Sequence, residues 1–314
     1  MRVLVTGATG FAGRWLVREL TDAGHDAVPT PSGAVLDVAD ASGVARLVHD
    51  VRPDAIAHLA GVAFGPAAAA DPALALRTAV AGTQAIFEGV RAAGLRCAVL
   101  VAGSSEVYGD PEPGDLPLAE DAPLRATRPY GLVKLAQEGV ALAAGARYRI
   151  PVVVTRSFNH VGPEQRPEFV IPAFAARVRA LRDGRAADIP VGNLDVRRDL
   201  TDVRDVARAY RLLLEGMVSG VGTPLIVNVA SGHSVAIRDV LVTMCRIAGV
   251  EAKTRVDAGL VRPGEPADVV GNPGPLARLT GWRPEIPLER TLADVFAYAP
   301  SHASATRPAR DAVS

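Results

Sequence analysis

A tyrosine and a lysine stand four residues apart at Tyr130 and Lys134. In a helix this spacing puts both side chains on one face, so the phenol and the ammonium would lie side by side. The ammonium would lower the phenol pKa from about 10 toward the working pH. Lysine is rare here, because only Lys134 and Lys253 are lysines among 34 basic residues. The pair therefore predicts proton exchange with a substrate oxygen.

A serine hydroxyl is expected close to this pair. The apolar run 97–102 reads as a strand, and Gly103-Ser104-Ser105-Glu106 follows it directly. Ligands bind where strands of a parallel sheet end, so Ser104 could hydrogen-bond the oxygen that Tyr130 protonates. A serine turn without a ligand is the alternative interpretation.

A glycine-rich turn opens the chain. Gly7-Ala8-Thr9-Gly10-Phe11-Ala12-Gly13 follows the first apolar run and precedes a segment with helical periodicity. Bare backbone N–H groups at a helix N-terminus suit the pyrophosphate of a dinucleotide. A tight strand-to-helix turn with no ligand is the other interpretation, but the position of the turn favours coenzyme binding.

The preference between the two nicotinamide coenzymes is expected to depend on the end of the second strand. An acidic residue at the end of the second strand would bind the ribose diol of NAD, and an arginine the 2′-phosphate of NADP. Residues 28–32 contain neither, which slightly favours NADP over NAD. Arg14 is a possible phosphate partner or an ordinary solvated arginine. Asp37 could accept from the adenine amino group or simply end a turn.

Periodicity indicates the elements that must position these residues. The apolar runs are continuous rather than alternating, which is typical of parallel strands covered on both faces. The strands are expected at 2–6, 26–30, 34–38, 55–60, 97–102, 151–158 and 225–229. The helices are expected at 12–23, 41–51, 72–93, 130–147 and 203–217, with Gly24 and Gly94 as stops. This alternation predicts an α/β fold with a Rossmann-type doubly wound parallel sheet.

Proline and glycine become more frequent after about residue 158, as in an irregular substrate-binding lobe. We therefore expect an NAD(P)-binding domain at 1–157, to which about 196–228 returns. The smaller C-terminal lobe is expected to comprise 158–195 and 229–299. Residues 300–314 lack an apolar period and read as a disordered tail.

Composition excludes several classes of protein. The 314 residues include 34 basic and 34 acidic side chains, so no bulk positive field would collect nucleic acid or a membrane surface. The two cysteines, Cys97 and Cys245, lack metal or disulfide spacing and suit a reducing compartment. The first apolar run is too short for a signal peptide, and no stretch predicts a membrane span. We expect a cytoplasmic protein without a bound metal.

Taken together, the GATGFAG turn, Ser104, Tyr130 and Lys134 resemble the extended short-chain dehydrogenase/reductase family of nucleotide-sugar enzymes over nearly the whole chain. This resemblance implies a catalytic set of Ser104, Tyr130 and Lys134, in which Lys134 also binds the nicotinamide ribose. The expected coenzyme-binding residues are Gly7, Gly10, Phe11, Ala12, Gly13, Arg14, Asp37, Val38, Leu59, Ala60, Tyr130, Lys134 and Phe158. Two positions depart from the family pattern, because Ala79 replaces a common Asn and Gly61 a common Ala.

Segments 156–163, 191–202 and 262–265 resemble the GDP-sugar branch of that family. The resemblance implies diphosphate contacts by Asn159, Arg198 and Arg262, with Asn193 near the guanine and Glu265 accepting from the nucleotide ribose. The full set of expected substrate-binding residues is Ser105, Asn159, Val170, Asn193, Arg198, Arg262 and Glu265. Arginine forks suit a diphosphate and a carboxylate suits a diol, although any single arginine could instead be solvated. We interpret His160 as a packed loop residue.

The implied reaction is NAD(P)H-dependent reduction of the C4 ketone of GDP-4-keto-6-deoxy-D-mannose to GDP-D-rhamnose. Glu106 joins the expected catalytic residues, since related 4,6-dehydratases use a Glu there as a base, but reductases carry Ser-Ser-Glu too. A 4,6-dehydratase or a 4-epimerase would use the same triad and regenerate its coenzyme in each turnover. Residues 159–163 and the short chain favour the reductase. A non-enzymatic protein that binds the coenzyme as a sensor would usually have a broken triad, and here the triad is intact. We also expect the protein to form a homodimer.

Overall fold

Six parallel strands form the central sheet of the computed structural model, which describes residues 1–33, 35–220, 226–262 and 264–298. The strand order is β2-β1-β3-β4-β5-β9. The strands are β1 (Arg2–Thr6), β2 (Asp26–Pro29), β3 (Ala55–His58), β4 (Ala98–Ala102), β5 (Val152–Ser157) and β9 (Ile226–Val229). The strand order reverses at β1, which has β2 on one side and β3 on the other. Such a switch point opens a crevice at the carboxyl ends of the strands.

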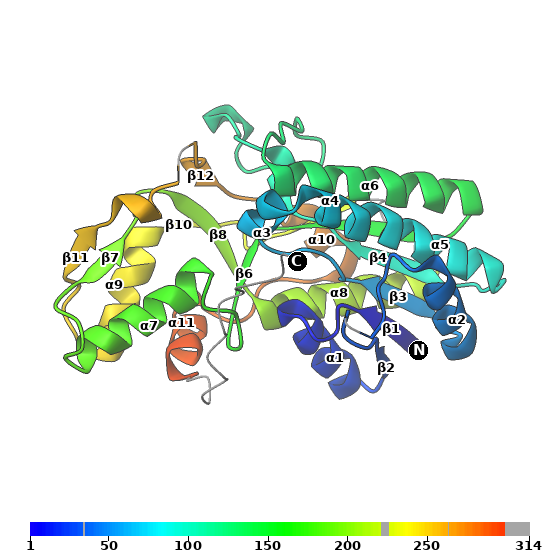
Figure 1. Cartoon of the computed structure of the whole chain (residues 1–314), viewed down its shortest axis with the longest axis horizontal. Coiled ribbons are helices and arrows are strands. Elements are labelled where there is room, and N and C mark those ends of the chain that lie inside the picture. The colour runs from blue at the N-terminus through cyan, green and yellow to red at the C-terminus, as the bar shows by residue number, and fades with distance from the viewer. Residues whose placement is uncertain (34, 221–225, 263, 299–314) are drawn as a thin grey trace, which may run out of the picture.

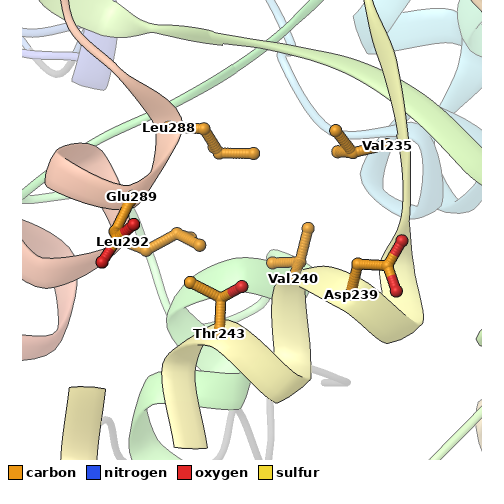
Figure 2. A pocket seen from close by; sticks show the side chains of 7 residues that line it. All are labelled: Val235, Asp239, Val240, Thr243, Leu288, Glu289 and Leu292. Carbon is orange, nitrogen blue, oxygen red and sulfur yellow. The ribbon is translucent and has the colours of Figure 1, made fainter. Parts of the chain in front are cut away.

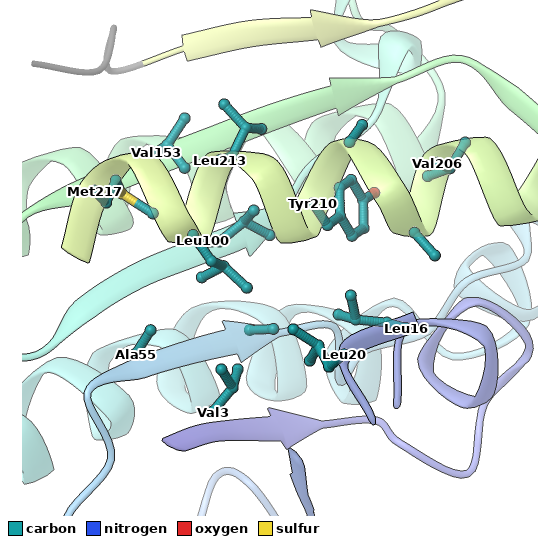
Figure 3. Packing of buried hydrophobic residues seen from close by; sticks show 14 of the residues in the cluster. Val3, Leu16, Leu20, Ala55, Leu100, Val153, Val206, Tyr210, Leu213 and Met217 are labelled. Carbon is teal, nitrogen blue, oxygen red and sulfur yellow. The ribbon is translucent and has the colours of Figure 1, made fainter. Parts of the chain in front are cut away.

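Helices cover both faces of this sheet, which explains why its strands are continuous apolar runs. One face carries α1 (Phe11–Asp22) and α8 (Val203–Val218), and the other carries α2 (Ala41–Val51), α5 (Gly82–Ala92) and α6 (Pro129–Tyr148) (Figure 1). Figure 3 shows how Leu16 and Leu20 of α1 and Leu213 of α8 pack against buried strand residues. The doubly wound α/β fold expected from the sequence is confirmed.

The expected helix at 72–93 is interrupted. The structure has α4 (Pro72–Leu76), a π-helical segment η1 (Arg77–Ala81) and then α5. A separate short helix, α3 (Gly65–Ala70), precedes them. Gly24 and Gly94 have positive φ angles directly after α1 and α5, as expected for helix stops.

The strand expected at 34–38 is not formed by its described residues 35–38, which have turn and irregular backbone. The Val35 and Leu36 N–H groups donate to the Ser32 carbonyl, and Val35 is 76% exposed. An apolar run becomes a strand only where a partner strand is within reach, and the described residues 35–38 pair with no strand. Asp37 therefore does not end a strand.

A second, smaller layer lies beside the main sheet (Figure 1). Its strands are β6 (Asn159–Val161), β7 (Ile189–Val191), β8 (Arg197–Asp202), β10 (Ser234–Ala236), β11 (Thr254–Val256) and β12 (Asp268–Val269). Its helices are α7 (Val170–Arg182), α9 (Ile237–Ala248) and α11 (Leu288–Ala297). Side chains of these helices and strands form a hydrophobic core distinct from that of the main sheet.

Some C-terminal residues return to the main sheet. Helix α10 (Gly274–Thr280) and the fully buried Trp282 pack into the core beneath α8. The indole N–H of Trp282 donates to the Asp205 carbonyl at 2.9 Å. The two-part division expected from the sequence stays a prediction, and the tail at 300–314 lies outside the described residues.

Among the described residues, no helix combines the length and apolar character needed to cross a membrane.

Candidate functional site

The segments expected to do chemistry emerge at one edge of the main sheet. Because β1, β3, β4 and β5 are parallel neighbours, the residues that follow them lie at the same carboxyl edge. These segments are the turn at 7–13, residues 59–61, residues 103–105 and residues 158–159. The fold thus brings the expected turn and the expected serine to one crevice.

The glycine turn forms a close-fitting backbone cradle. Gly7 has φ +70°, and a Cβ there would lie 2.7 Å from the Ala60 nitrogen. A Cβ on Gly13 would lie 2.1 Å from the Gly7 carbonyl oxygen. Side chains are excluded at both positions, and the N-terminus of α1 opens directly behind them. The turn therefore fits the pyrophosphate of a dinucleotide.

Two polar residues support the cradle from below. The Ala60 N–H donates to the Thr6 hydroxyl at 3.2 Å, and that hydroxyl is 2.8 Å from Nδ1 of His58. Burial lowers the pKa of His58 to about 3, with a further contribution from the Lys134 charge. His58 is therefore neutral and serves to hold the switch point rather than to bind an anion.

The catalytic candidates are assembled by α6 and the 3₁₀ turn η2 (Ser105–Tyr108). A Cβ on Gly131 would lie 2.5 Å from the Glu106 carbonyl oxygen, so only glycine allows α6 to approach η2 this closely. The contact brings Tyr130 beside Ser104, whose hydroxyl also accepts from the Glu106 N–H at 3.2 Å. Ser104, Tyr130 and Glu106 therefore share one end of the crevice.

Lys134 lies directly behind the phenol. Its Nζ is 5.9 Å from the centre of the Tyr130 ring and donates to the Ala102 carbonyl at 2.8 Å and to the Gln137 amide oxygen at 2.9 Å. The side chain is buried, which lowers the pKa of Lys134 to about 8. At neutral pH the ammonium is still mostly charged.

The expectation that Lys134 lowers the phenol pKa is wrong for this structure. Burial raises the pKa of Tyr130 above its usual value, the Glu106 carboxylate raises it further, and Ser104 opposes them as a hydrogen-bond partner. Desolvation disfavours the phenolate more than the neighbouring groups stabilise it. The phenol is therefore in its acid form.

A carboxylate and three arginines line the same crevice. Burial raises the pKa of Glu106, against the charges of Arg128, Arg198 and Arg262. Glu106 is exposed to solvent, yet the protein atoms near it are dense enough to disfavour its charged form. Three guanidinium groups around one opening favour a ligand with several negative charges.

Arg198 and Glu265 are brought together as a pair. Nη2 of Arg198 is 2.9 Å from Oε1 of Glu265, and Nη1 donates to the Pro266 carbonyl at 2.9 Å. Three other expected substrate residues lie near the smaller layer: Asn159 and Asn193 are exposed, and Val170, the first residue of α7, is 40% exposed. Ser105, the first residue of η2, is instead buried at 6% exposure.

A hollow of about 280 Å³ lies next to the glycine turn, between α1 and the end of β2. Ala8, Thr9, Arg14, Val17, Arg18 and Pro29 line it. Both arginines contact Glu164, Arg14 through Nε at 2.8 Å and Arg18 through Nη1 at 2.7 Å. Arg14 donates in addition to the Glu164 and Thr9 carbonyls, whereas Arg18 stacks over Trp15.

Two residues expected to bind the coenzyme, Asp37 and Phe158, have side chains that contact other parts of the protein. Asp37 forms a 2.7 Å ion pair with Arg77. The pKa of Asp37 is lowered mainly by a hydrogen bond from the Ala39 N–H, and next by the hydrogen bond from Arg77. The ring of Phe158 is 2% exposed and packs beside Tyr108 in a core cluster. Asp37 is paired rather than free, and the Phe158 side chain faces the core.

A second cavity, of about 140 Å³, lies in the lobe between α9 and α11 (Figure 2). It is lined by Val235, Asp239, Val240, Thr243, Leu288, Glu289 and Leu292. Its two charged residues are both acidic, so it does not suit an anionic ligand. In the described part of the chain, no three His, Cys, Asp or Glu side chains form a metal-binding group.

Four residues of the site were missed from the sequence: Arg18, Arg128, Gln137 and Glu164. Arg128 caps α6 two residues before Tyr130 and donates to the Gly264 carbonyl. Gln137 follows Lys134 at the i+3 helical spacing, which was a usable signal. Glu164 approaches α1 only through the tertiary fold, and no local pattern marks it.

Comparisons with known proteins identify similar sequences and similar folds. A family model described as the NAD dependent epimerase/dehydratase family matches residues 3–230. The chain is 34% identical to GDP-6-deoxy-D-mannose reductase from Pseudomonas aeruginosa, covering 94% of this chain and 96% of that protein. The structure of RMD from Pseudomonas aeruginosa complexed with NADPH matches with a TM-score of 0.85, 32% identity and coverage of 94% and 98%.

Epimerases are similar as well. The structure of UDP-glucose 4-epimerase from Thermus thermophilus in complex with NAD matches with a TM-score of 0.81 and 27% identity, covering 95% of this chain and 98% of that one. The fold is therefore shared with proteins solved with either coenzyme.

Proposed function

Because the chain belongs to the NAD dependent epimerase/dehydratase family, we propose that it is an NAD(P)H-dependent nucleotide-sugar 4-ketoreductase. Its substrate is GDP-4-keto-6-deoxy-D-mannose and its product GDP-D-rhamnose. The observation that carries the proposal is the 34% identity to a reductase along nearly the whole chain, compared with 29% to a UDP-glucose 4-epimerase and 27% to a dTDP-glucose 4,6-dehydratase.

The coenzyme is held at the switch point. Backbone N–H groups of the turn at 7–13 and the N-terminus of α1 bind the pyrophosphate. The third ammonium N–H of Lys134, left over after the Ala102 and Gln137 bonds, would donate to the nicotinamide ribose. The bound nicotinamide supplies the hydride that reduces the ketone.

Tyr130 supplies the proton. Ketone reduction adds a hydride to C4 and a proton to the oxygen, so the catalytic tyrosine must begin in its acid form. The raised pKa of Tyr130 keeps that proton in place before reaction. Ser104 orients the carbonyl oxygen toward the phenol, and the ammonium of Lys134 stabilises the phenolate left after transfer.

The arginines of the crevice recognise the nucleotide diphosphate. Arg198 and Arg262 provide forked donors, and Arg128 adds a third charge at the mouth of the same opening. Glu265 already holds Arg198 in place at 2.9 Å and keeps its second oxygen for a ribose hydroxyl. Asn159, Asn193 and the exposed start of α7 complete the substrate surface.

The direct test mixes the purified protein with GDP-4-keto-6-deoxymannose and either NADPH or NADH, and follows nicotinamide absorbance. A reductase consumes one reduced coenzyme for each ketone. No oxidation of either coenzyme would reject the proposal. Conversion of GDP-mannose or of a UDP-hexose without net coenzyme consumption would instead identify a dehydratase or an epimerase.

A 4,6-dehydratase is the second candidate, and Glu106 is the observation that favours it. The carboxylate lies at the Tyr130 end of the crevice, and burial raises its pKa, as suits a group that takes and returns protons. Glu106→Gln distinguishes the two reactions. It would abolish elimination of water but reduce ketone reduction only a few-fold.

NADPH is the proposed preferred coenzyme. Residues at the end of β2 offer no acid for a ribose diol, and the adjoining hollow contains Arg14 and Arg18. Three donor atoms of Arg14 are already used, whereas Arg18 donates to Glu164 through Nη1 alone. Arg18 therefore has the donors to bind a 2′-phosphate.

Arg18→Gln tests this preference. Losing one charge-assisted hydrogen bond should weaken NADPH binding about tenfold, whereas NADH, which lacks the phosphate, provides the internal control and should bind as before. Dissociation constants from nicotinamide fluorescence measure both. Equal weakening of the two coenzymes would contradict a 2′-phosphate site at Arg18.

We also place the enzyme in the cytoplasm as a homodimer. Cys97 and Cys245 are both unpaired and buried, which suits a reducing compartment. The adjoining helices α4 and α6 expose Leu74, Leu76 and Leu132, each more than 40% accessible. A second copy is the partner proposed for this apolar surface.

A further inference from the structure

The ammonium of Lys134 is held from below by a buried amide. Nζ donates to the Gln137 side-chain oxygen at 2.9 Å and to the Ala102 carbonyl at 2.8 Å. Gln137 is 1% exposed and Lys134 7% exposed. Two of the three ammonium protons are thus directed into the protein, and the third is the one available to the crevice.

The orientation of the amide is dictated by its neighbours. An ammonium only donates hydrogen bonds, so the amide oxygen must face Lys134. The amide nitrogen then faces Thr83 of α5 and donates to its hydroxyl at 3.1 Å. Thr83 is fully buried. The chain Thr83, Gln137, Lys134 therefore runs from α5 through α6 to the end of β4.

We propose that Gln137 is a positioning residue for the catalytic ammonium. It fixes the direction of the third Lys134 proton and stabilises the charged form of the lysine in a buried place. Burying an amide is costly unless its hydrogen bonds are made. Here the amide oxygen accepts from Lys134 and the amide nitrogen donates to Thr83. The inference rests on the proposed function only for the role of Lys134 in reduction.

The charged and titratable surroundings of Lys134 are few. His58 at the end of β3 and Tyr130, one turn earlier on α6, are the titratable groups that face it. In the described structure α5 contributes the neutral Thr83 hydroxyl and β4 the Ala102 carbonyl. Since no carboxylate pairs with the ammonium there, the neutral oxygens of Ala102 and Gln137 are what hold it.

Two variants of Gln137 have opposite expected effects on the lysine. Gln137→Met keeps the length of the side chain but removes the oxygen, so the charged lysine loses a partner and its titration midpoint falls. Gln137→Glu replaces the amide by a carboxylate, which favours the ammonium and raises the midpoint. Each shift should be about one pH unit.

The two lysines of the chain make a direct measurement feasible. Lysine labelled with ¹³C gives one Cε signal for Lys134 and one for Lys253, and an NMR titration follows each. In the parent we expect Lys134 to titrate near pH 8 and Lys253 to serve as the internal reference. No substrate is needed, so this experiment stands whether or not the proposed reaction is correct.

Gln84→Met is the matched control. Gln84 lies on α5 next to Thr83 and donates to Glu88 and Tyr148, away from Lys134. This variant should leave the Lys134 midpoint unchanged. An unchanged midpoint in Gln137→Met, or a shift in the same direction in both Gln137 variants, would overturn the proposal, because a purely structural amide would not produce opposite shifts.

Kinetics supply the second readout. In Gln137→Met we expect kcat to fall about tenfold, with the alkaline limb of its pH profile moved to lower pH and the KM for the sugar nucleotide nearly unchanged. Gln137→Glu should move that limb to higher pH and recover part of kcat. Opposite midpoint shifts in an inactive parent would reject the proposed function while supporting the role of Gln137.

Discussion

At the residue level, burial acts in opposite directions on the two members of the Tyr130 and Lys134 pair. It disfavours the charged form of each, so it raises the pKa of the phenol and lowers the pKa of the ammonium to about 8. Near neutral pH the phenol keeps its proton and the lysine keeps its charge. That combination is the one that ketone reduction requires.

Replacing Tyr130 by Phe tests the proton donor. The variant removes only the hydroxyl, so kcat for reduction should fall by about 10² to 10⁴, while NADPH binding stays within a few-fold of the parent. Steady-state rates and coenzyme titration measure these quantities. Tyr148→Phe, at the far end of the same helix, is the control and should retain full activity. Equal rates for Tyr130→Phe and the parent would remove the basis of the mechanism.

The pH dependence of reduction follows from the lysine. Its ammonium is present below a pKa of about 8 and is lost as the pH rises through it. The phenol stays protonated across that range, because its pKa is raised. We therefore predict a plateau in kcat/KM below pH 8 and a decline above it with a slope of one proton. A rate that increased from pH 7 to 9 would be incompatible with this assignment.

At the level of elements, helix α6 carries Tyr130 and Lys134, so its position relative to the sheet must be fixed. Gly131 allows its N-terminus to contact η2, and Glu138 ties its middle to β5. The Glu138 carboxylate accepts from Arg156 Nη2 at 2.6 Å and from Nε at 3.0 Å, with both side chains at most 5% exposed. The site therefore depends on a buried ion pair outside it.

Removing one member of that pair should be costly. Glu138→Ala leaves the guanidinium of Arg156 buried without its carboxylate, and we expect a loss of about 3–5 kcal/mol in the free energy of unfolding. Urea denaturation measures it. The double variant Glu138→Ala with Arg156→Met should recover part of the loss, since no charge then remains buried. A loss below about 1 kcal/mol in the single variant would mean that solvent reaches the pair.

At the level of the whole molecule, the six-stranded sheet and the smaller layer of strands and helices lie side by side (Figure 1). Arg198 of β8 and Glu265 before β12 belong to the smaller layer, whereas Ser104 follows β4 of the main sheet and Tyr130 lies on α6. Contacts such as the pair between Glu164 and α1 join the two parts. Substrate and coenzyme would therefore meet where the two parts face each other.

The oligomeric state is a prediction at this scale. If the exposed leucines of α4 and α6 face a second copy, light scattering after gel filtration should give twice the chain mass of 32.6 kDa. Leu74→Glu combined with Leu76→Glu should then yield monomers that still bind NADPH. A monomeric parent at micromolar concentration would contradict the proposed dimer.

Local patterns in the sequence were sufficient for most of the main domain. The positions of β1, α1 and α2 follow from periodicity and glycine stops, and the glycine turn could be assigned because it directly follows the first strand. The helical spacing of Tyr130 and Lys134 depends on neighbouring residues alone, so it was readable as well. The strand expected at 34–38 failed because strand formation depends on a partner that lies elsewhere in the chain.

The tertiary structure decided everything that depends on segments distant in sequence. Glu164 approaches Arg14 across 150 residues, and Gln137 approaches Thr83 across 54. The direction of the Tyr130 pKa shift was also decided there, because the amount of protein around a phenol is a property of the packed molecule. Sequence spacing determines which groups are neighbours along a helix, whereas burial and long-range pairing determine the charge that each group carries.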